Sequence, residues 1–184
     1  MILEPHDFKR LLPLPLTLIT TVDGEGRANA APYGCVMPIL RPLDIIAIAS
    51  ALPRDTLKNI RETQEFVVNV VVPASFRKAM LCSKSYPPGV NELEEVGLES
   101  VPARKVKPPR VKDSLGWIEA KLEEEILRDK YSLIIGKVVC AEINEAYYSE
   151  GKLKESPIVI LFPFFKKVGE KVGSREEFEN IMSH

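Results

Sequence analysis

The sequence predicts a mainly β protein, an antiparallel barrel with peripheral helices. Three observations lead to this fold class: strand-like runs joined by short turns, two long runs with one polar face, and a helical segment inserted between strands. The 184 residues suit one domain over residues 1–184, with a core at about 8–165. We therefore expect no second domain.

A β-hairpin opens the predicted sheet. Residues 16–22 form a β-branched run, residues 23–26 (Asp-Gly-Glu-Gly) have turn chemistry, and residues 27–36 resume as a strand. Asn29 and Pro32 interrupt the second strand, so we expect a bulge that frees backbone polar groups. The alternative is that the segment around Pro32 only ends a strand or lies on a sheet edge.

The other elements follow from apolar periodicity and from breaks at Pro and Gly. They are strands at 44–49, 65–71, 115–127, 131–144 and 158–161, and helices at 55–64, 75–81, 91–96 and 174–182. Residues 128–130 join the two long strands as a second hairpin. In the strand at 115–127, one face carries Ile118, Ala120, Leu122 and Ile126, and the other, expected to be solvated, carries Glu119, Glu123 and Glu125.

Composition excludes several classes of protein. With a net charge of −1 and 45% hydrophobic residues, neither disorder nor a general attraction to nucleic acid or anionic membrane is indicated. The three cysteines contain no CxxC pair, which argues against a disulfide framework or a zinc site. No signal peptide and no apolar run long enough to span a membrane is present, so we expect a cytoplasmic protein.

The helix predicted at 55–64 begins with an unusual charge pattern. Asp55 is the expected N-cap, and Lys58 holds the third helical position, where Glu or Gln would complete a capping box. Arg54, Lys58, the Thr56 hydroxyl and the free amides of a helix N-terminus would together bind a phosphate monoester. Taken alone, the segment is better explained by a solvated helix start with ordinary surface cations, and the phosphate site gains support only from its context.

Other candidate features favour structural roles. A basic strip, which would suit RNA, is more simply a solvated loop; it comprises Arg104, Lys105, Lys107, Arg110 and Lys112. The carboxylates at 123–125 point to alternate faces and have no histidine nearby, so they indicate a solvated face rather than a metal site. Cys35 and Cys82 are redox-relay candidates, although lone cysteines are commonly small hydrophobes. For the aromatic segment at 162–165 we expect dimer or core packing.

The order and spacing of several motifs resemble one known family. They are Leu18-Ile19-Thr20-Thr21-Val22-Asp23, Asn29-Ala30-Ala31-Pro32-Tyr33, Arg54-Asp55-Thr56-Leu57-Lys58-Asn59-Ile60, Glu65-Phe66-Val67-Val68-Asn69 and Tyr86-Pro87-Pro88-Gly89-Val90 before Glu92 and Glu94. The chain is similar to the flavin reductase-like FMN-binding proteins, near the flavoredoxin branch. The resemblance implies an antiparallel split β-barrel and a homodimer with one FMN per subunit near the subunit interface.

Carried over by position, the resemblance assigns two stretches to the cofactor. The residues implied are Ala31, Pro32, Tyr33, Gly34, Cys35 and Val36 beside the flavin ring, and Ser50, Ala51, Arg54, Asp55, Thr56, Lys58 and Asn59 around the ribityl chain and phosphate. For Tyr33, a half-buried aromatic at the barrel rim is the better interpretation than a specific ring contact.

The resemblance implies an FMN-dependent oxidoreductase that passes electrons or hydride to a small acceptor. No catalytic side chain is expected, because the histidines His6 and His184 lie near the ends of the chain and no nucleophilic triad is evident. Some relatives have a late histidine near the nicotinamide, which residues 156–165 lack, so the electron donor stays open. The alternatives are a non-catalytic FMN-binding electron carrier and, less favoured, a barrel that binds nucleic acid.

Overall fold

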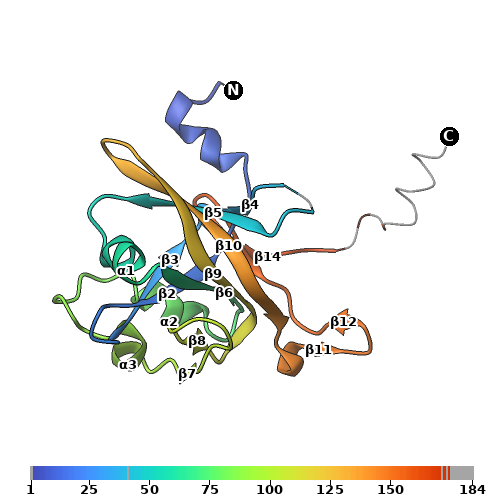
Figure 1. Cartoon of the computed structure of the whole chain (residues 1–184). Helices are drawn as coiled ribbons and strands as arrows, with labels where there is room; N and C mark the ends of the chain where they lie inside the picture. The colour runs from blue at the N-terminus through green and yellow to red at the C-terminus, as the bar shows by residue number, and fades with distance from the viewer. Residues whose placement is uncertain (1, 41, 171, 173, 175–184) are drawn as a thin grey trace.

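A curled antiparallel sheet dominates the computed structural model, which describes residues 2–40, 42–170, 172 and 174. Within this part of the chain the sheet has seven strands in the order β3-β2-β6-β9-β10-β5-β4 (Figure 1). Its strands are β2 (Thr17–Val22), β3 (Ala28–Tyr33), β4 (Val36–Pro38), β5 (Ile45–Ala51), β6 (Glu65–Val71), β9 (Ser114–Leu127) and β10 (Tyr131–Ile143). The mainly β, antiparallel fold predicted from the sequence is confirmed.

The two edges of this sheet are joined by the chain itself. Edge strand β3 continues through Gly34 and Cys35 into β4, the strand at the opposite edge. The Ala49 amide donates to the Cys35 carbonyl oxygen at 2.9 Å, which holds this link against β5. The sheet therefore curls into an incomplete barrel rather than lying open.

Smaller elements surround the barrel. They are η1 (Pro5–Arg10), β1 (Leu14–Pro15), α1 (Asp55–Thr63), α2 (Phe76–Leu81), α3 (Glu92–Val96), β7 (Ser100–Val101), β8 (Arg110–Val111), η2 (Glu145–Tyr147), β11 (Tyr148–Ser149), β12 (Lys152–Leu153), β13 (Ile158–Leu161) and β14 (Phe164–Lys167). Strands β1, β13 and β14 form a separate antiparallel sheet. The strands predicted at 65–71 and 158–161 have the observed bounds. The helix expected at 174–182 lies, apart from Ser174, outside the described residues.

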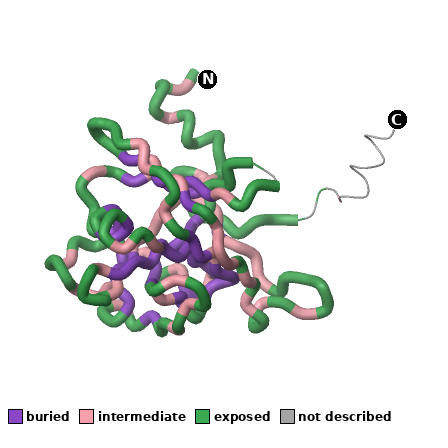
Figure 2. Tube along the Cα trace, in the orientation of Figure 1, coloured by how far each residue is buried: buried purple, intermediate pink, exposed green. Residues whose placement is uncertain are grey.

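Two apolar clusters form the core. Figure 2 shows where the buried segments lie along the chain trace. One includes Phe66 and Ile134 from the barrel strands together with Leu57 and Ile60 from α1. The other lies where α2 and α3 cover β2 and β3, and it includes Leu93. Full burial of a side chain as large as Phe66 stabilises the fold by about 1.5–3 kcal/mol.

Gly136 makes room for the Phe66 ring inside the barrel. A Cβ atom at position 136 would lie 2.5 Å from Cζ of Phe66, closer than real contacts allow. Gly136 pairs with Leu122 of β9, next to a register shift in the β9–β10 ladder. The central strands are thus shaped around this aromatic ring.

The expected bulge at Asn29 and Pro32 is wrong. Strands β2 and β3 pair in regular register from Thr17 opposite Tyr33 to Val22 opposite Ala28. Strand β3 lies at the sheet edge, where a residue without an N–H is tolerated. The alternative interpretation is therefore the correct one: Pro32 lies on a sheet edge.

The solvated face expected for the glutamates of β9 is wrong at Glu119, which is completely buried. Its carboxylate accepts bonds from the backbone amides of Arg104 and Lys105 and from the Arg110 guanidinium. Arg110 is itself only 4% exposed and also pairs with Glu142 at 2.9 Å. The loop described above as solvated is therefore tied to the barrel by a buried ion pair.

The aromatic segment at 162–165 does not belong to the core of this chain. Phe162, Phe164 and Phe165 are 47%, 63% and 42% exposed. Phe165 meets Phe76 of α2 edge to face, with ring centroids 5.0 Å apart. Of the two roles expected for this segment, packing in the core is therefore wrong, and packing in a dimer interface stays a prediction.

Candidate functional site

Helix α1 begins at Asp55, within the predicted range, but its N-cap lies one residue earlier than expected. Arg54, not Asp55, is the N-cap, and no side chain caps the helix. Asp55 is the first helical residue, where a carboxylate is favourable to the helix dipole. The third helical position is consequently Leu57, so the capping-box argument made for Lys58 is wrong. Helix ends shift easily by one residue, because the terminal turn depends on few hydrogen bonds.

The two cations of this helix start are exposed. Among the described residues, neither Arg54 nor Lys58 makes a side-chain hydrogen bond or ion pair. By contrast, Arg61 at the other end of α1 forms a bidentate pair with Glu125. The basic start of α1 is therefore available to an external anion, as its sequence suggested.

Thr56 and Asn59 lie on the buried side of the same turn. The Thr56 hydroxyl donates to the Asn29 side-chain oxygen at 3.4 Å, and the Asn59 amide donates to the Thr21 hydroxyl at 3.1 Å. These bonds fasten α1 to β2 and β3. Thr56 thus has a partner within the protein and does not face outward with Lys58.

A polar pocket of about 150 Å³ lies beside the first turn of α1. Of the predicted phosphate residues, the structure brings Asp55, Lys58 and Asn59 to its wall, but not Arg54 or Thr56. The rest of the lining comes from the β2–β3 turn, from β3, from the loop before α3 and from the first residue of α3, and comprises Asp23, Arg27, Ala28, Asn29, Pro88, Gly89, Val90 and Glu92. This is a concave site with cationic and anionic groups in contact range of one another.

Glu92 joins this wall to the sheet. Its carboxylate accepts from the Asn29 amide nitrogen at 3.0 and 3.1 Å and from the Ala30 backbone N–H at 2.9 Å. Sequence reasoning missed Glu92, Arg27 and Asp23 as pocket residues. A buried Asn in an edge strand signals that a polar partner exists, but the chain order does not say which residue supplies it.

The stretch assigned to the flavin ring begins on edge strand β3 and meets the second assigned stretch directly. The Tyr33 hydroxyl lies 2.9 Å from the Ser50 hydroxyl, and the Tyr33 carbonyl oxygen accepts from Thr17 at 2.9 Å. Tyr33 is half-buried against the barrel cluster, as expected. The fold therefore brings together two segments that the sequence separates.

The other residues of the assigned ring stretch differ in accessibility. Cys35 is exposed, as is Ala51 of the second stretch, whereas Ala31, Pro32 and Gly34 are half-buried. Val36 belongs to the barrel core, so its side chain is not available to a ligand. A contact with Val36 would have to use its backbone.

Burial makes Cys82 a poor redox thiol. Desolvation, with a smaller contribution from the nearby Glu92 charge, raises the pKa of the Cys82 thiol to about 12. A thiol with this pKa stays protonated near neutral pH and reacts slowly. Cys82 is therefore the small buried hydrophobe of the sequence interpretation. No group of three or more potential metal ligands occurs in the described part of the chain.

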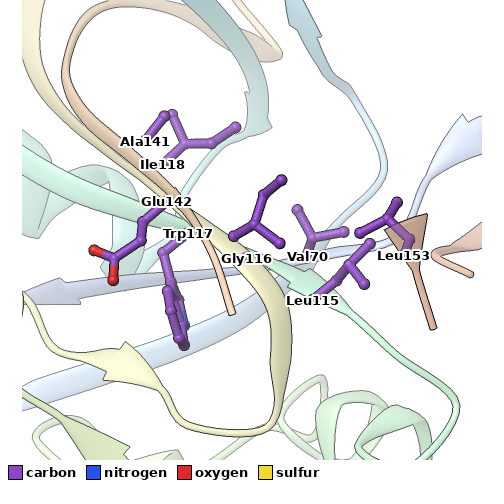
Figure 3. A pocket seen from close by; sticks show the side chains of 9 residues that line it. Val70, Leu115, Gly116, Trp117, Ile118, Ala141, Glu142 and Leu153 are labelled. Carbon is purple, nitrogen blue, oxygen red and sulfur yellow. The ribbon is translucent and has the colours of Figure 1, made fainter. Parts of the chain in front are cut away.

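A second, apolar pocket of about 300 Å³ lies at the ends of β6, β9 and β10 (Figure 3). Its walls include Val70, Leu115, Ile118, Ile143 and Leu153. The labelled side chains of Trp117 and Glu142 point away from this apolar group. The pocket contains no group suited to hold a phosphate, which separates it from the polar pocket beside α1.

Comparison with known proteins identifies the family. Residues 8–157 match the family model described as a flavin reductase like domain. The chain belongs to the flavin reductase-like family. An uncharacterized protein of Methanothermobacter thermautotrophicus is 43% identical to it over 153 residues, which cover 81% of this chain and 72% of that protein.

Solved structures with a similar fold are consistent with this family assignment. The 2-nitrobenzoate 2-nitroreductase of Pseudomonas fluorescens is similar with a TM-score of 0.80 and 27% identity, covering 94% of this chain and 91% of that one. The flavoredoxin of Methanosarcina acetivorans is similar with a TM-score of 0.84 over 99% of this chain and 98% of that one, and at 20% identity it shows the shared fold. The split barrel expected from the sequence is confirmed.

None of the described helices is both long enough and apolar enough to cross a bilayer.

Proposed function

We propose that this member of the flavin reductase-like family binds FMN and acts as a reductase, with residues 1–184 forming one flavin-binding domain. The observation that carries the proposal is the polar pocket beside an α1 N-terminus that no side chain caps and whose cations, Arg54 and Lys58, have no partner among the described residues. Bound FMN supplies a ring that accepts and passes on electrons or hydride. The protein's task is to hold and orient this ring.

The phosphate of FMN fits the chemistry of this helix start. Amide groups at a helix N-terminus carry a positive partial charge and donate to anions. Lys58 adds a full charge at the pocket wall, and Arg54 stands at the N-cap. A charge-assisted bond to phosphate contributes about 1.5–3 kcal/mol.

The edge strand β3 supports the proposed place of the flavin ring. Its outer edge lies outside the seven-stranded ladder, and Pro32 contributes a carbonyl group but no N–H there. The bond between Tyr33 and Ser50 keeps the proposed ring and ribityl stretches adjacent. The cofactor would thus extend from α1 along β3.

A homodimer with FMN near its interface is part of the proposal. Strands β1 and β13 lie next to the end of β3, since a Cβ at Gly34 would lie 2.8 Å from Ile160 of β13 and 3.7 Å from Leu14 of β1. Neighbouring exposed residues include Leu11, Leu12, Phe162 and Phe164. Apolar and aromatic groups of this kind form the centre of subunit interfaces. The cytoplasmic location stays a prediction.

Absorbance tests the cofactor. The purified protein should take up FMN, show a flavin spectrum and release FMN when denatured. Anaerobic mixing with NADH or NADPH then tests the reductase: bleaching of the flavin band supports it, in line with the nitroreductase name of the Pseudomonas fluorescens relative. Uptake of FMN without bleaching by either donor would indicate an electron carrier. A colourless protein with salt-sensitive RNA binding would overturn the proposal.

A further inference from the structure

We propose that Glu92 is a positioning residue of the flavin site, which acts through Asn29 and the Ala30 N–H to set the first turn of α1 against strand β3. In the proposed function these two segments hold opposite ends of the cofactor, the phosphate at α1 and the ring along β3. Glu92 thus acts on the cofactor through its partners in the protein and not by direct contact. This inference rests on the proposed function and deepens it.

The carboxylate of Glu92 is bonded to the edge strand at two points. Its two oxygens accept from the Asn29 side-chain nitrogen at 3.1 and 3.0 Å, and one of them also accepts from the Ala30 N–H at 2.9 Å. Asn29 is 7% exposed, and Ala30 is completely buried. A buried donor that loses its acceptor costs the free energy of its desolvation. Glu92, the first residue of α3, therefore holds α3 to β3.

Asn29 extends this connection to α1. Its side-chain oxygen accepts from the hydroxyl of Thr56, the second residue of the helix, at 3.4 Å. Only the nitrogen of the Asn29 amide can donate to a carboxylate, so the bonds to Glu92 leave its oxygen facing Thr56. Thr56 is 3% exposed, which keeps water away from this bond. A continuous chain of hydrogen bonds thus runs from α3 through β3 to the helix start.

This chain of bonds controls the first turn of α1 more than the rest of the helix. The next turn has its own attachment, because the Asn59 amide donates to the Thr21 hydroxyl of β2. Losing the bonds of Glu92 should therefore loosen the helix start without detaching the helix. The helix start carries the uncapped amides and Lys58, the groups proposed to hold phosphate. Two linked contacts of one ligand strengthen each other only when the protein holds both at the matching spacing.

The charge of Glu92 predicts the opposite effect from positioning. Glu92 lies in the wall of the polar pocket, where a carboxylate repels a phosphate. If this repulsion were its whole contribution, Glu92→Gln would strengthen the binding of FMN relative to riboflavin, which has no phosphate. Positioning predicts that the same variant weakens FMN relative to riboflavin. The sign of the change therefore separates the two explanations.

The test compares the ratio of the riboflavin to the FMN dissociation constant in variants of the full chain, measured by fluorescence titration. In Glu92→Gln the new amide nitrogen faces one of two donors, so we expect this ratio to fall about fivefold or more. Asn29→Asp places two carboxylates against each other and should also lower the ratio. The double variant with both changes again pairs a donor with an acceptor and keeps the net charge of the pair. Its ratio should return to within about twofold of the unmodified protein.

Glu95→Gln is the matched control. Glu95 lies on α3 with an exposed side chain outside the pocket, so the variant removes the same charge without touching the chain of bonds. Its ratio should stay that of the unmodified protein. Circular dichroism checks that each variant is folded, and a general loss of stability would affect both ligands alike and leave the ratio unchanged.

Each outcome decides a separate point. Failure of the unmodified protein to bind either flavin would overturn the proposed function. Flavin binding with a ratio that Glu92→Gln leaves unchanged or raises would overturn only the inference, and so would a double variant no better than the single ones. If Glu92→Gln does not fold, Thr56→Val carries the test, because it breaks the same chain of bonds at its other end. A folded Thr56→Val protein with an unchanged ratio would show that these bonds do not position α1.

Discussion

The guanidinium of Arg110 and the carboxylate of Glu119 form an ion pair 2.5 Å apart, with side chains 5% and 0% exposed. The Arg110 guanidinium also lies over the Trp117 ring, 4.9 Å from its centroid. Glu119 is on β9, and Arg110 is on β8 at the end of the loop that crosses the barrel. The pair thus fastens a charged loop to an apolar sheet.

Removing one partner of this pair should destabilise the protein strongly. Glu119→Ala leaves the Arg110 charge buried with Glu142 as its one carboxylate partner among the described residues, so we expect the free energy of unfolding to fall by about 3 kcal/mol or more. Urea denaturation at neutral pH measures this change. Glu123→Ala, an exposed position on the same strand, should alter stability by only about 0.5 kcal/mol. Similar small losses for both variants would contradict a structural role of the ion pair.

Lys58→Glu should weaken FMN binding at least about tenfold, because a charge-assisted bond is replaced by repulsion. Riboflavin lacks the phosphate, so its affinity should change much less. Dissociation constants for both ligands come from fluorescence titration. Lys154→Glu makes the same charge change on an exposed residue outside the pocket and should leave both affinities unchanged. Equal losses of FMN and riboflavin would show that Lys58 does not touch phosphate.

Tyr33→Phe should loosen the junction between β3 and β5. The variant removes the hydroxyl that pairs with Ser50 and keeps the ring that packs on the barrel cluster. We expect the free energy of unfolding to fall by about 0.5–1.5 kcal/mol, the net value of one such hydrogen bond. Thermal and urea denaturation measure the loss, and the double variant Tyr33→Phe with Ser50→Ala should lose little more. Fully additive losses would mean that the two hydroxyls act independently.

Stability should depend on pH through Glu142. Hydrogen bonds from Arg104, then from Arg110, lower the pKa of Glu142 from an ordinary 4.5 to about 2. Because the folded-state pKa is depressed, this carboxylate contributes stability above pH 4.5 and loses it as the pH falls from 4.5 towards 2. Glu142→Gln should therefore flatten the decline of stability in this interval. Urea denaturation at several pH values from 7 to 3 tests the slope, and an unchanged slope would assign the acid sensitivity to other groups.

The local pattern of apolar and polar residues was sufficient to predict the positions of most strands. The apolar run at Glu65–Val71 and the short strand at Ile158–Leu161 have the predicted bounds, because alternation and β-branched content act within a few residues. The N-cap of α1 was missed by one residue, since the choice between Arg54 and Asp55 depends on a few terminal hydrogen bonds. The helix start was nevertheless recognised as a basic segment, although Asp55 was expected to cap it and no side chain does.

The local sequence pattern could not predict contacts between segments that are far apart in the chain. The sequence placed Glu119 on a solvated face because its neighbours alternate in polarity, yet a loop from residues 104–110 covers that position. The bulge expected at Pro32 did not form, because β3 lies at an edge where the missing N–H costs no ladder bond. In both cases a tertiary neighbour, absent from the local pattern, decided the outcome.

By itself, the sequence determined the mainly β class, the positions of the principal strands and the family resemblance that the comparisons bear out. Only the tertiary structure decided that Lys58, Arg27 and Glu92 share one pocket and that Glu92 bonds Asn29 across 63 positions of the chain. The physical reason is range: strand formation reflects the polarity of adjacent residues, whereas a binding pocket is made by groups that meet after the sheet has curled.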